Sequence, residues 1–293
     1  KTNGLFFDGA ITDNINIRQY VSETAPYFLC NFVISNGRFS LVPALPTTAS
    51  GEISTGAVQI KQLFTAGNII EESYELEYLG AEERKPFQAV MRYRQEQLNQ
   101  LTQERTVVVR RTEDDEYAPV ESFDLTRFCT SRAHAVLVAK FFLSIRKRVT
   151  HTIRFKTTPY GMDLAPGDYI KVITEASPYS AARNGTISST GVITSVSALA
   201  DGQYSILYYL PGSEDIASGI MSVSGGKVAD TSLYGCVFTI KEVTVSENIY
   251  MIEQLSLDED SNVQIAATEF PCTSDFVSVM AQDVKTGTFI VED

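Results

Sequence analysis

The most informative pattern along the chain is helical and covers residues 130–148. Apolar residues occupy most of the circumference of a helix that Thr130 or Ser131 would cap and that would end near Lys147. So wide an apolar surface is typical of a helix that packs on several sides. The remaining arc is mostly polar, although Leu137 and Phe141 also fall within it, and its polar members are His134, Lys140, Ser144, Lys147 and Arg148.

Directly after this helix the pattern becomes alternating, which predicts a strand at 149–156. Turn residues such as Pro166-Gly167-Asp168 separate further short runs of this kind. Seven strands with short connections, and no convincing helix between them, predict an antiparallel barrel or sandwich. Two longer connections, 175–190 and 211–232, are rich in Ser, Gly and Ala and are expected to be exposed loops. The other six strands are expected at 168–173, 191–197, 204–210, 235–243, 249–255 and 263–270.

The residues before the helix predict a mixed α and β portion. Apolar spacing predicts a helix over 12–30 that Asp13 or Asn14 would cap, and Asn36-Gly37 predicts the turn of a hairpin over 30–43. Further strands are expected at 68–78, 87–95 and 105–111, with a loop or short helix at 95–104 and a solvated acidic turn at 113–116.

Together these elements predict a mainly β fold with an α+β portion, in which antiparallel β-barrel domains accompany one packed linking helix. The length of 293 residues favours more than one domain. The expected division is an α+β domain at 1–123, the linking helix at 124–148, an antiparallel barrel at 149–271 and a C-terminal extension at 272–293.

Composition narrows the function classes. The net charge is −12 and the pI is near 4.7, which argues against a general nucleic-acid binder because phosphate neutralisation needs a basic face. This charge does not exclude a protein that DNA slides past. The apolar runs are shorter than the roughly 20 residues that cross a bilayer, so membrane insertion is not expected. Because the chain begins at Lys1 rather than Met, we expect it to be a processed or partial piece of a longer protein.

The search for chemistry finds little. The four cysteines are widely separated, without a CxxC pair, and are expected to be free and mostly buried. Only His134 and His151 are available for metal or nucleophile chemistry, and no phosphate-binding glycine motif, GxSxG or HExxH occurs. Asp163 and Asp168 lie five residues apart, but the Pro-Gly-Asp turn explains Asp168 locally. No cofactor is expected.

One weak metal pattern remains. Residues at positions one, three, five and twelve of a calcium loop are matched by Asp258, Asp260, Asn262 and Glu269. Position six requires glycine but is Val263, and the flanking segments read as strands rather than helices. A charged hairpin turn is therefore favoured over a calcium site.

Residues 123–172 resemble a segment of the tail-hub, or tip attachment (host-specificity), proteins of long-tailed bacteriophages. Their sequence is FDLTRFCTSRAHAVLVAKFFLSIRKRVTHTIRFKTTPYGMDLAPGDYIKV. The shared features are an Asp-Leu-Thr lead-in, an Ala-rich helix with a basic end, a Thr-rich strand and a Pro-Gly-Asp turn. Two further segments are similar to parts of the proteins of that family. They are NIIEESYELEYLG at 68–80, which is similar to a strand, and IYMIEQLSLDEDSNVQIAATEF at 249–270, which is similar to the closing hairpin of the hub barrel. Asn262 stands near the glycine that is usual in the closing hairpin. The resemblance covers roughly 68–272.

The resemblance implies a structural virion protein at the tail tip, assembled as a trimer around the tail axis. Its implied partners are the distal tail ring protein, the tape-measure protein and tail fibre or receptor-binding proteins, and DNA would pass through without specific binding. No catalytic centre is implied for these residues. An acidic channel wall, including the glutamates at 71–83, would repel DNA and let it pass.

Two other function classes stay open. A receptor- or carbohydrate-binding module would use some of the 14 tyrosines, although tryptophan, the usual stacking residue, is missing from the sequence. A cell-wall hydrolase is disfavoured because no catalytic motif is found.

The basic end of the helix admits two explanations. Arg146, Lys147 and Arg148 lie in the last turn, where cations complement the carbonyl end of the helix dipole. They would also be placed to pair with carboxylates of the same or a neighbouring subunit. The residues expected to serve packing and assembly are Leu137, Phe141, Phe142, Ile145, Arg146, Lys147 and Arg148.

If the helix packs as expected, Phe142→Asp will prevent assembly, because it places a charge on a surface that must be buried. Light scattering of the purified variant would check this. Soluble oligomers of the correct size would count against the packing role.

Overall fold

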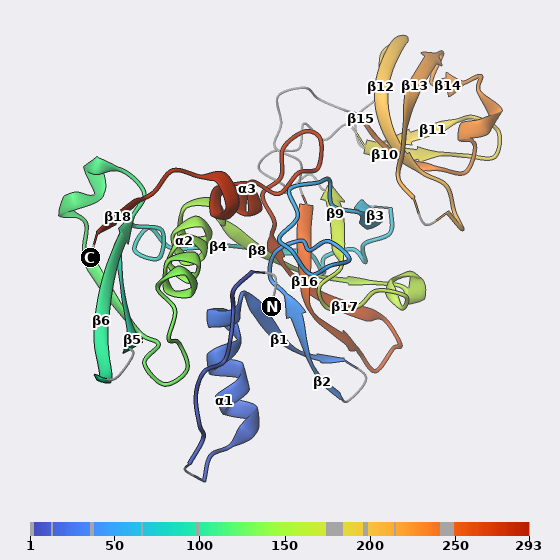
Figure 1. Cartoon of the computed structure of the whole chain (residues 1–293). Coiled ribbons are helices and arrows are strands. Elements are labelled where there is room, and N and C mark those ends of the chain that lie inside the picture. The colour runs from blue at the N-terminus through green and yellow to red at the C-terminus, as the bar shows by residue number, and fades with distance from the viewer. Residues whose placement is uncertain are drawn as a thin grey trace. The chain divides into compact units, whose positions relative to one another are not determined.

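The computed structural model describes residues 3–12, 14–35, 38–65, 67–97, 100–173, 184–195, 199–213, 215–240 and 249–292 (Figure 1). As the sequence predicts, the fold is mainly β: 43% of it is strand, three α-helices occur in the described part, and the curled sheets include a nearly closed barrel. Two compact units make up the chain, and each contains segments that are distant in sequence.

Unit 1 consists of residues 1–56, 79–150 and 278–293. It contains two β-hairpins, all three described α-helices and the C-terminal strand (Figure 1). Its elements are α1 (Ile17–Thr24), the 3-10 helix η1 (Ala25–Phe28), β1 (Cys30–Ser35), β2 (Arg38–Pro43), β5 (Gln88–Gln97), β6 (Gln100–Arg110), the 3-10 helix η2 (Glu113–Tyr117), β7 (Val120–Asp124), α2 (Arg132–Arg148), α3 (Val279–Thr286) and β18 (Ile290–Glu292).

The core of unit 1 forms between α2 and a four-stranded sheet of order β18-β6-β5-β7. Strands β5 and β6 form an antiparallel hairpin, β7 joins β5 in parallel, and β18 joins β6 in antiparallel pairing. Alternate residues are buried from Ala89 to Tyr93 in β5 and at Val107 and Val109 in β6, which gives α2 one apolar face to pack on. That face includes Ala89, Met91, Tyr93, Val107 and Val109.

Unit 2 consists of residues 57–78 and 151–277. Its elements are β3 (Ile60–Thr65), β4 (Glu75–Tyr78), β8 (His151–Thr157), the 3-10 helix η3 (Pro159–Gly161), β9 (Tyr169–Ile173), β10 (Asn184–Ile187), β11 (Ile193–Ser195), β12 (Gly202–Tyr209), β13 (Ala217–Ser224), β14 (Lys227–Val228), the 3-10 helix η4 (Thr231–Leu233), β15 (Val237–Ile240), β16 (Ile249–Leu257) and β17 (Val263–Glu269).

Two six-stranded sheets form unit 2. The first has the order β3-β9-β16-β17-β8-β4, and its core includes Phe64, Phe155 and Tyr250. Strand β8 is buried at alternate positions, as its sequence predicts. The turn before β9 places Gly167 at φ 95°, a conformation that favours glycine.

The second sheet has the order β11-β10-β15-β12-β13-β14 and a separate apolar core. The part expected as an antiparallel barrel over 149–271 therefore contributes strands to two sheets, and a small buried cluster of Leu63, Ile173 and Tyr209 contains residues from both. The core of the second sheet contains Ile187, Ile206, Met221, Val223, Val228, Leu233, Cys236 and Phe238.

Several local predictions were wrong. The segment 211–232, expected as a loop, contains β13 and β14. In β13, Met221 and Val223 are buried and alternate with the exposed residues Ile220, Ser222 and Ser224. The polar segment 95–104 belongs mostly to the β5–β6 hairpin, because cross-strand pairing overrides its polar composition. Strand β4 is shorter than the expected 68–78, and the helix expected over 12–30 is limited to α1 and η1.

Some turn and cap predictions fall on residues that are not described. The hairpin β1–β2 is confirmed, but Asn36-Gly37 lies outside the described residues, as do Asp13, most of the loop expected at 175–190, and the end of the strand expected at 235–243. Asn16, rather than Asn14, caps α1, and it accepts a hydrogen bond from the backbone N–H of Gln19 at 3.3 Å.

The two units also cut across the expected sequential division. Residues 57–78 pair with strands of unit 2, and residues 278–293 pack in unit 1. Hydrophobic periodicity gives the type of an element but not its strand partner, so such long-range pairings leave no local signal. None of the described helices is both long and apolar enough to cross a bilayer.

Replacing Phe155 by alanine should lower the free energy of unfolding of unit 2 by about 3–5 kcal/mol, because the cavity opens beside Phe64, whose ring centroid lies 4.9 Å away. Urea titration monitored by far-UV circular dichroism measures the change. Leu257→Ala is the matched control on the exposed end of β16 and should shift stability by less than about 0.5 kcal/mol. Equal losses in the two variants would contradict this assignment of the core.

Candidate assembly site around helix α2

The N-terminus of α2 is fixed by Ser131, which caps the helix by accepting a hydrogen bond from the backbone N–H of His134 at 3.5 Å. The ring of His134 is buried against Phe28, and its Nε2 lies 2.8 Å from the carbonyl oxygen of Tyr27. Burial lowers the pKa of His134 more than the Tyr27 carbonyl raises it. The neutral imidazole therefore donates its Nε2–H to that carbonyl and ties α2 to η1.

Aromatic rings hold the middle of α2 inside unit 1. Phe142 contacts the rings of Tyr27, Phe123 and Phe141, with centroid distances of 5.7, 5.1 and 5.9 Å. Phe141 is buried, whereas Phe142 is half-buried. Phe142→Asp would therefore destabilise unit 1 itself, so its effect on assembly must be separated from its effect on folding.

Arg146 joins the basic end of α2 to the sheet. Its two terminal nitrogens donate to the two carboxylate oxygens of Glu121 at 2.9 and 3.0 Å, and its guanidinium carbon lies 4.4 Å from the centroid of the Phe87 ring. This arrangement combines a bidentate ion pair with a cation–π contact. Arg146 thus pairs with a carboxylate of the same chain, one of the two possibilities that its sequence position left open.

Arg148 joins the same end of α2 to α3. It donates to both oxygens of Asp283 at 2.9 and 3.1 Å, and Arg111 donates to Asp283 at 3.1 Å. Burial raises the pKa of Asp283, but the hydrogen bonds from Arg148 and Arg111 outweigh burial and leave this pKa below its ordinary value. Asp283 is therefore ionised and bridges two arginines. Lys147 is exposed.

The C-terminal segment is held to α2 and to β6 by further cations. The Nζ of Lys140 lies 5.3 Å from the centroid of the Phe289 ring, and Arg110 pairs with Glu292 at 2.7 Å. On the other side of α3, Lys285 donates to the carbonyl oxygen of Ile53 at 3.1 Å. Residues 278–293 therefore form an integral part of unit 1.

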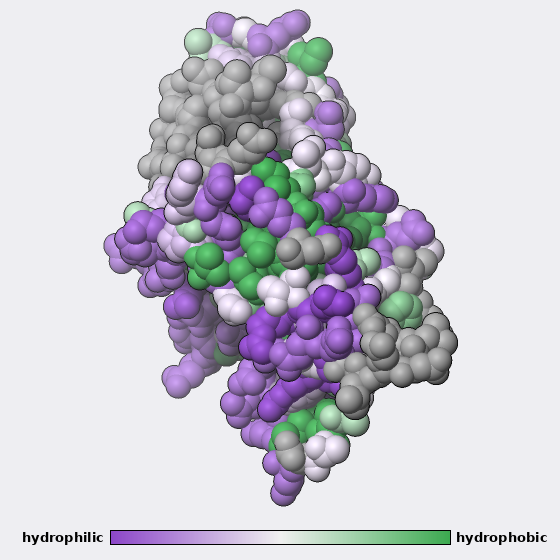
Figure 2. Space-filling view, turned by 60° about the vertical axis from the view of Figure 1, so that its left-hand side comes forward, coloured by the Kyte–Doolittle hydropathy of each residue, from purple (hydrophilic) through white to green (hydrophobic). Residues whose placement is uncertain are grey.

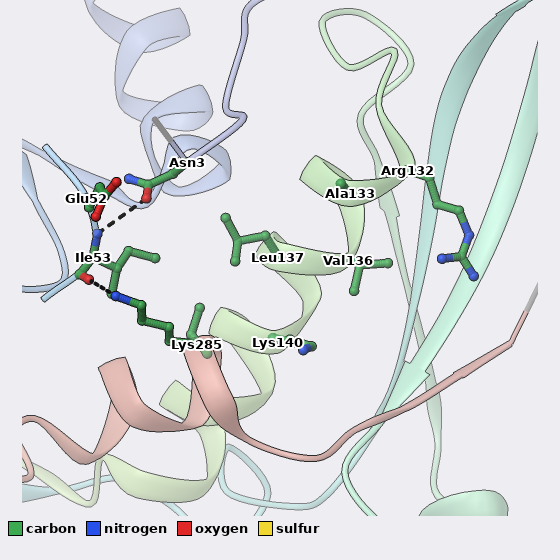
Figure 3. A pocket seen from close by; sticks show the side chains of 10 residues that line it. Asn3, Glu52, Ile53, Arg132, Ala133, Val136, Leu137, Lys140 and Lys285 are labelled. Carbon is green, nitrogen blue, oxygen red and sulfur yellow. Dashed lines mark hydrogen bonds between the residues drawn. The ribbon is translucent and has the colours of Figure 1, made fainter. Parts of the chain in front are cut away.

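One side of α2 is left open as a groove of about 540 Å³ (Figure 3). The helix supplies its floor, the segment around Ile53 forms one wall, and α3 forms another. Leu137 points across the groove toward Ile53, whereas Arg132 points away toward the neighbouring strands (Figure 3). The residues on α2 that line the groove are Arg132, Ala133, Val136, Leu137 and Lys140.

The open side of α2 differs from the arc expected from its sequence. His134, Phe141 and Ser144, which were expected in this arc, are buried, whereas Ala133, which was expected outside it, is exposed. Leu137 lies in the expected arc and is half-buried. Ile145 is also half-buried. The face that a helix exposes is set by where its partners lie, and those partners come from β5, β6, η1 and α3.

The calcium pattern folds as a hairpin turn. Asp258 accepts hydrogen bonds from the backbone N–H groups of Asp260 and Asn262 at 3.0 and 2.9 Å, and its other oxygen pairs with Lys156 at 3.0 Å. The hydrogen bond from Lys156 is the main cause of the lowered pKa of Asp258. Glu269 stands at the opposite end of β17, roughly 20 Å along the strand. The four candidate ligands are therefore not brought together.

Other candidate chemistry is also explained locally. Asp168 accepts a hydrogen bond from the backbone N–H of Ala165 at 2.8 Å, which closes the Pro-Gly-Asp turn. All four cysteines are free, and Cys129, Cys236 and Cys272 are buried, as the sequence predicts. Among the residues that the structure describes, no three His, Cys, Asp or Glu side chains are grouped to hold a metal ion.

Exposed apolar side chains mark a second surface on unit 1, the β1–β2 hairpin. Phe39 is 60% exposed, and Leu41 and Ile34 are also exposed on this two-stranded sheet. Phe39 stacks on Phe32 with centroids 5.5 Å apart and lies under the guanidinium of Arg18. Figure 2 shows one face of the chain, on which apolar residues gather in a few places within a mostly hydrophilic surface.

No protein-family model and no curated protein matches this chain. Among solved structures, it is similar to a chain of the virion of a native gene transfer agent particle, with a TM-score of 0.41, 12% identity, and coverage of 88% of this chain and 39% of that chain. It is also similar to the tail protein from Neisseria meningitidis MC58, with a TM-score of 0.38, 9% identity, and coverage of 89% and 57%.

A third similar structure is the 43 kDa tail protein of prophage MuSo2 from Shewanella oneidensis, with a TM-score of 0.36, 6% identity, and coverage of 92% and 58%. This chain thus spans between about two fifths and three fifths of the three structures. TM-scores below 0.5 do not establish a common fold.

Asp283→Asn should lower the free energy of unfolding by about 1.5–3 kcal/mol at pH 7, because two arginines lose their charged partner. Because the pKa of Asp283 is lowered in the folded state, its contribution is present above the unfolded pKa of about 3.9. The contribution is lost as the pH falls through the lower folded value. Urea titrations at pH 7 and in steps from pH 5 to pH 2 measure it.

Glu82→Gln is the matched control, since Glu82 pairs with Lys85 on the exposed surface and such pairs contribute at most about 1 kcal/mol. A deficit in Asp283→Asn that is as large at pH 2 as at pH 7 would show that the ion bridge is not its source.

Proposed function

We propose that the chain is a structural virion protein, a subunit of the central hub at the tip of a bacteriophage tail. In this proposal it forms a ring, most simply a trimer, that joins the tail tube to tip or fibre proteins and lets DNA pass. Its partners are further copies of the chain, the distal tail ring protein, the tape-measure protein and fibre or receptor-binding proteins.

The proposal rests mainly on the segment from Phe123 to Val172, in which a sequence resemblance and an order of elements agree. Its sequence resembles the tail-hub family, and it folds as the element order that the resemblance implies: the capped helix α2 with a basic last turn, strand β8, the glycine turn at Gly167 and strand β9. The closing hairpin implied at 249–270 is present as β16 and β17. These parts of the resemblance lie far apart in the sequence, so their joint occurrence supports it.

A role in assembly also accounts for the surface. An isolated two-stranded sheet with exposed apolar residues, such as β1–β2, is a suitable surface for contact with a neighbouring chain. Ring subunits need such surfaces, whereas an enzyme needs a cleft with convergent catalytic groups. We also retain the proposal that exposed glutamates, including Glu75 and Glu77 of β4, repel DNA at a channel wall.

The mass of the purified chain and its place in the particle test this proposal. Native mass spectrometry should give a closed oligomer, most simply three copies, and gold-labelled antibodies against the chain should bind intact particles at the tail tip. A chain that is monomeric at all concentrations and is not found at the tip would contradict the proposal. Binding of the monomer to one class of glycan on an array would instead favour the receptor-binding alternative.

A further inference from the structure

An acidic turn of unit 1 presents an aromatic side chain to solvent. The run Glu113–Glu116 in η2 is acidic at every position, and the turn is stabilised where Thr112 and Asp115 form a capping box. Tyr117 follows it and is 92% exposed, and Glu116 beside it is also exposed. A large ring held in water on an ordered turn has an unused capacity for burial. We name residues 115–117 the acidic knob.

The α2 groove has the complementary properties. Its wall and floor offer apolar contact from Ile53, Val136 and Leu137. Two cations, Lys140 and Lys285, line it against one carboxylate, Glu52, in a chain whose net charge is −12. Lys140 also lies over the Phe289 ring, and Lys285 also donates to the Ile53 carbonyl. Its volume of about 540 Å³ falls within the usual range for pockets that bury a small molecule, so there is room for one tyrosine side chain. The groove therefore favours an apolar group that is flanked by negative charge.

We propose that the acidic knob of one copy of this chain inserts into the α2 groove of a second copy. Tyr117 fills the groove over Val136 and Leu137, and the knob carboxylates Asp115 and Glu116 lie near Lys140 and Lys285. This inference rests on the proposed function, because it names the surfaces through which identical subunits meet.

The pairing of a knob with a groove explains how a ring can close. The two surfaces differ and both belong to unit 1, so every copy carries one of each. Such a head-to-tail contact leaves a free knob at one end of a pair and a free groove at the other, and repetition with a closing rotation produces a ring. A buried tyrosine flanked by charge pairs is a common anchor of protein interfaces.

Two substitutions at exposed positions test the contact while leaving the core of unit 1 intact, and two more serve as controls. Tyr117→Ala removes the anchor, and Ala133→Glu adds a carboxylate on the exposed edge of the groove. Ala133→Lys is the matched control for bulk. Ile17→Ala is the control for loss of an exposed apolar side chain elsewhere on unit 1. Circular dichroism establishes that each variant is folded.

Sedimentation equilibrium of the full chain should show that Tyr117→Ala weakens self-association roughly 10- to 100-fold. Ala133→Glu should weaken it more than Ala133→Lys does, and Ile17→Ala should leave it unchanged. If Tyr117→Ala and Ala133→Glu associate as the wild type does, the knob–groove contact is wrong although the ring proposal stands. A wild type that remains monomeric at every concentration overturns both.

Photo-crosslinking identifies the occupant of the groove directly. The photoreactive residue p-benzoylphenylalanine replaces Tyr117 in protein mixed from ¹⁴N- and ¹⁵N-labelled preparations, so that crosslinks between copies are recognised by mass. The expected crosslinks join position 117 of one copy to peptides containing residues 52–53, 132–140 or 284–285 of another. Crosslinks between copies that map elsewhere, or crosslinks within one copy only, would overturn the proposal.

Discussion

The structure of unit 1 depends on covering the apolar surface of helix α2. This helix has 17 residues and buries His134, Ala135, Val138, Ala139, Phe141, Leu143 and Ser144. The hairpin β5–β6 covers one side, η1 contacts its N-terminal half, and α3 returns from the end of the chain to cover another side. Burial of this surface is the main favourable contribution that the helix makes to folding. What the partners leave open, at Ala133, Val136 and Leu137, becomes the groove.

Ion pairs at the end of α2 connect the helix to the segments that cover it. Glu121 orients Arg146 over Phe87, and Asp283 bridges Arg148 and Arg111, so a strand and a distant helix are each tied to the end of α2. Helix α2 therefore packs against distant segments of the chain inside unit 1. Its uncovered side lines the groove through which we propose that copies of the chain meet.

Features with a local cause were predictable from the sequence. The Ser131 cap, the alternating burial of β8 and the turn at Gly167 each follow from a few adjacent residues. The partners of the basic residues were not predictable, because Asp283 lies 135 residues from Arg148 and no local pattern connects them. The same limit hid the groove, since its walls come from residues near 53 and 285. The charged hairpin turn that the sequence favours over a calcium site is present, since Asp258 accepts two backbone hydrogen bonds in the turn while Glu269 lies at the far end of β17.

We propose that this chain assembles with copies of itself around an axis and does not act alone. A cryo-electron microscopy reconstruction of the particle that contains it is the most direct test. The account predicts several copies related by rotation about the tail axis, with the acidic turn of each copy against α2 of the next. A single copy per particle, or copies that touch only other proteins, would contradict it.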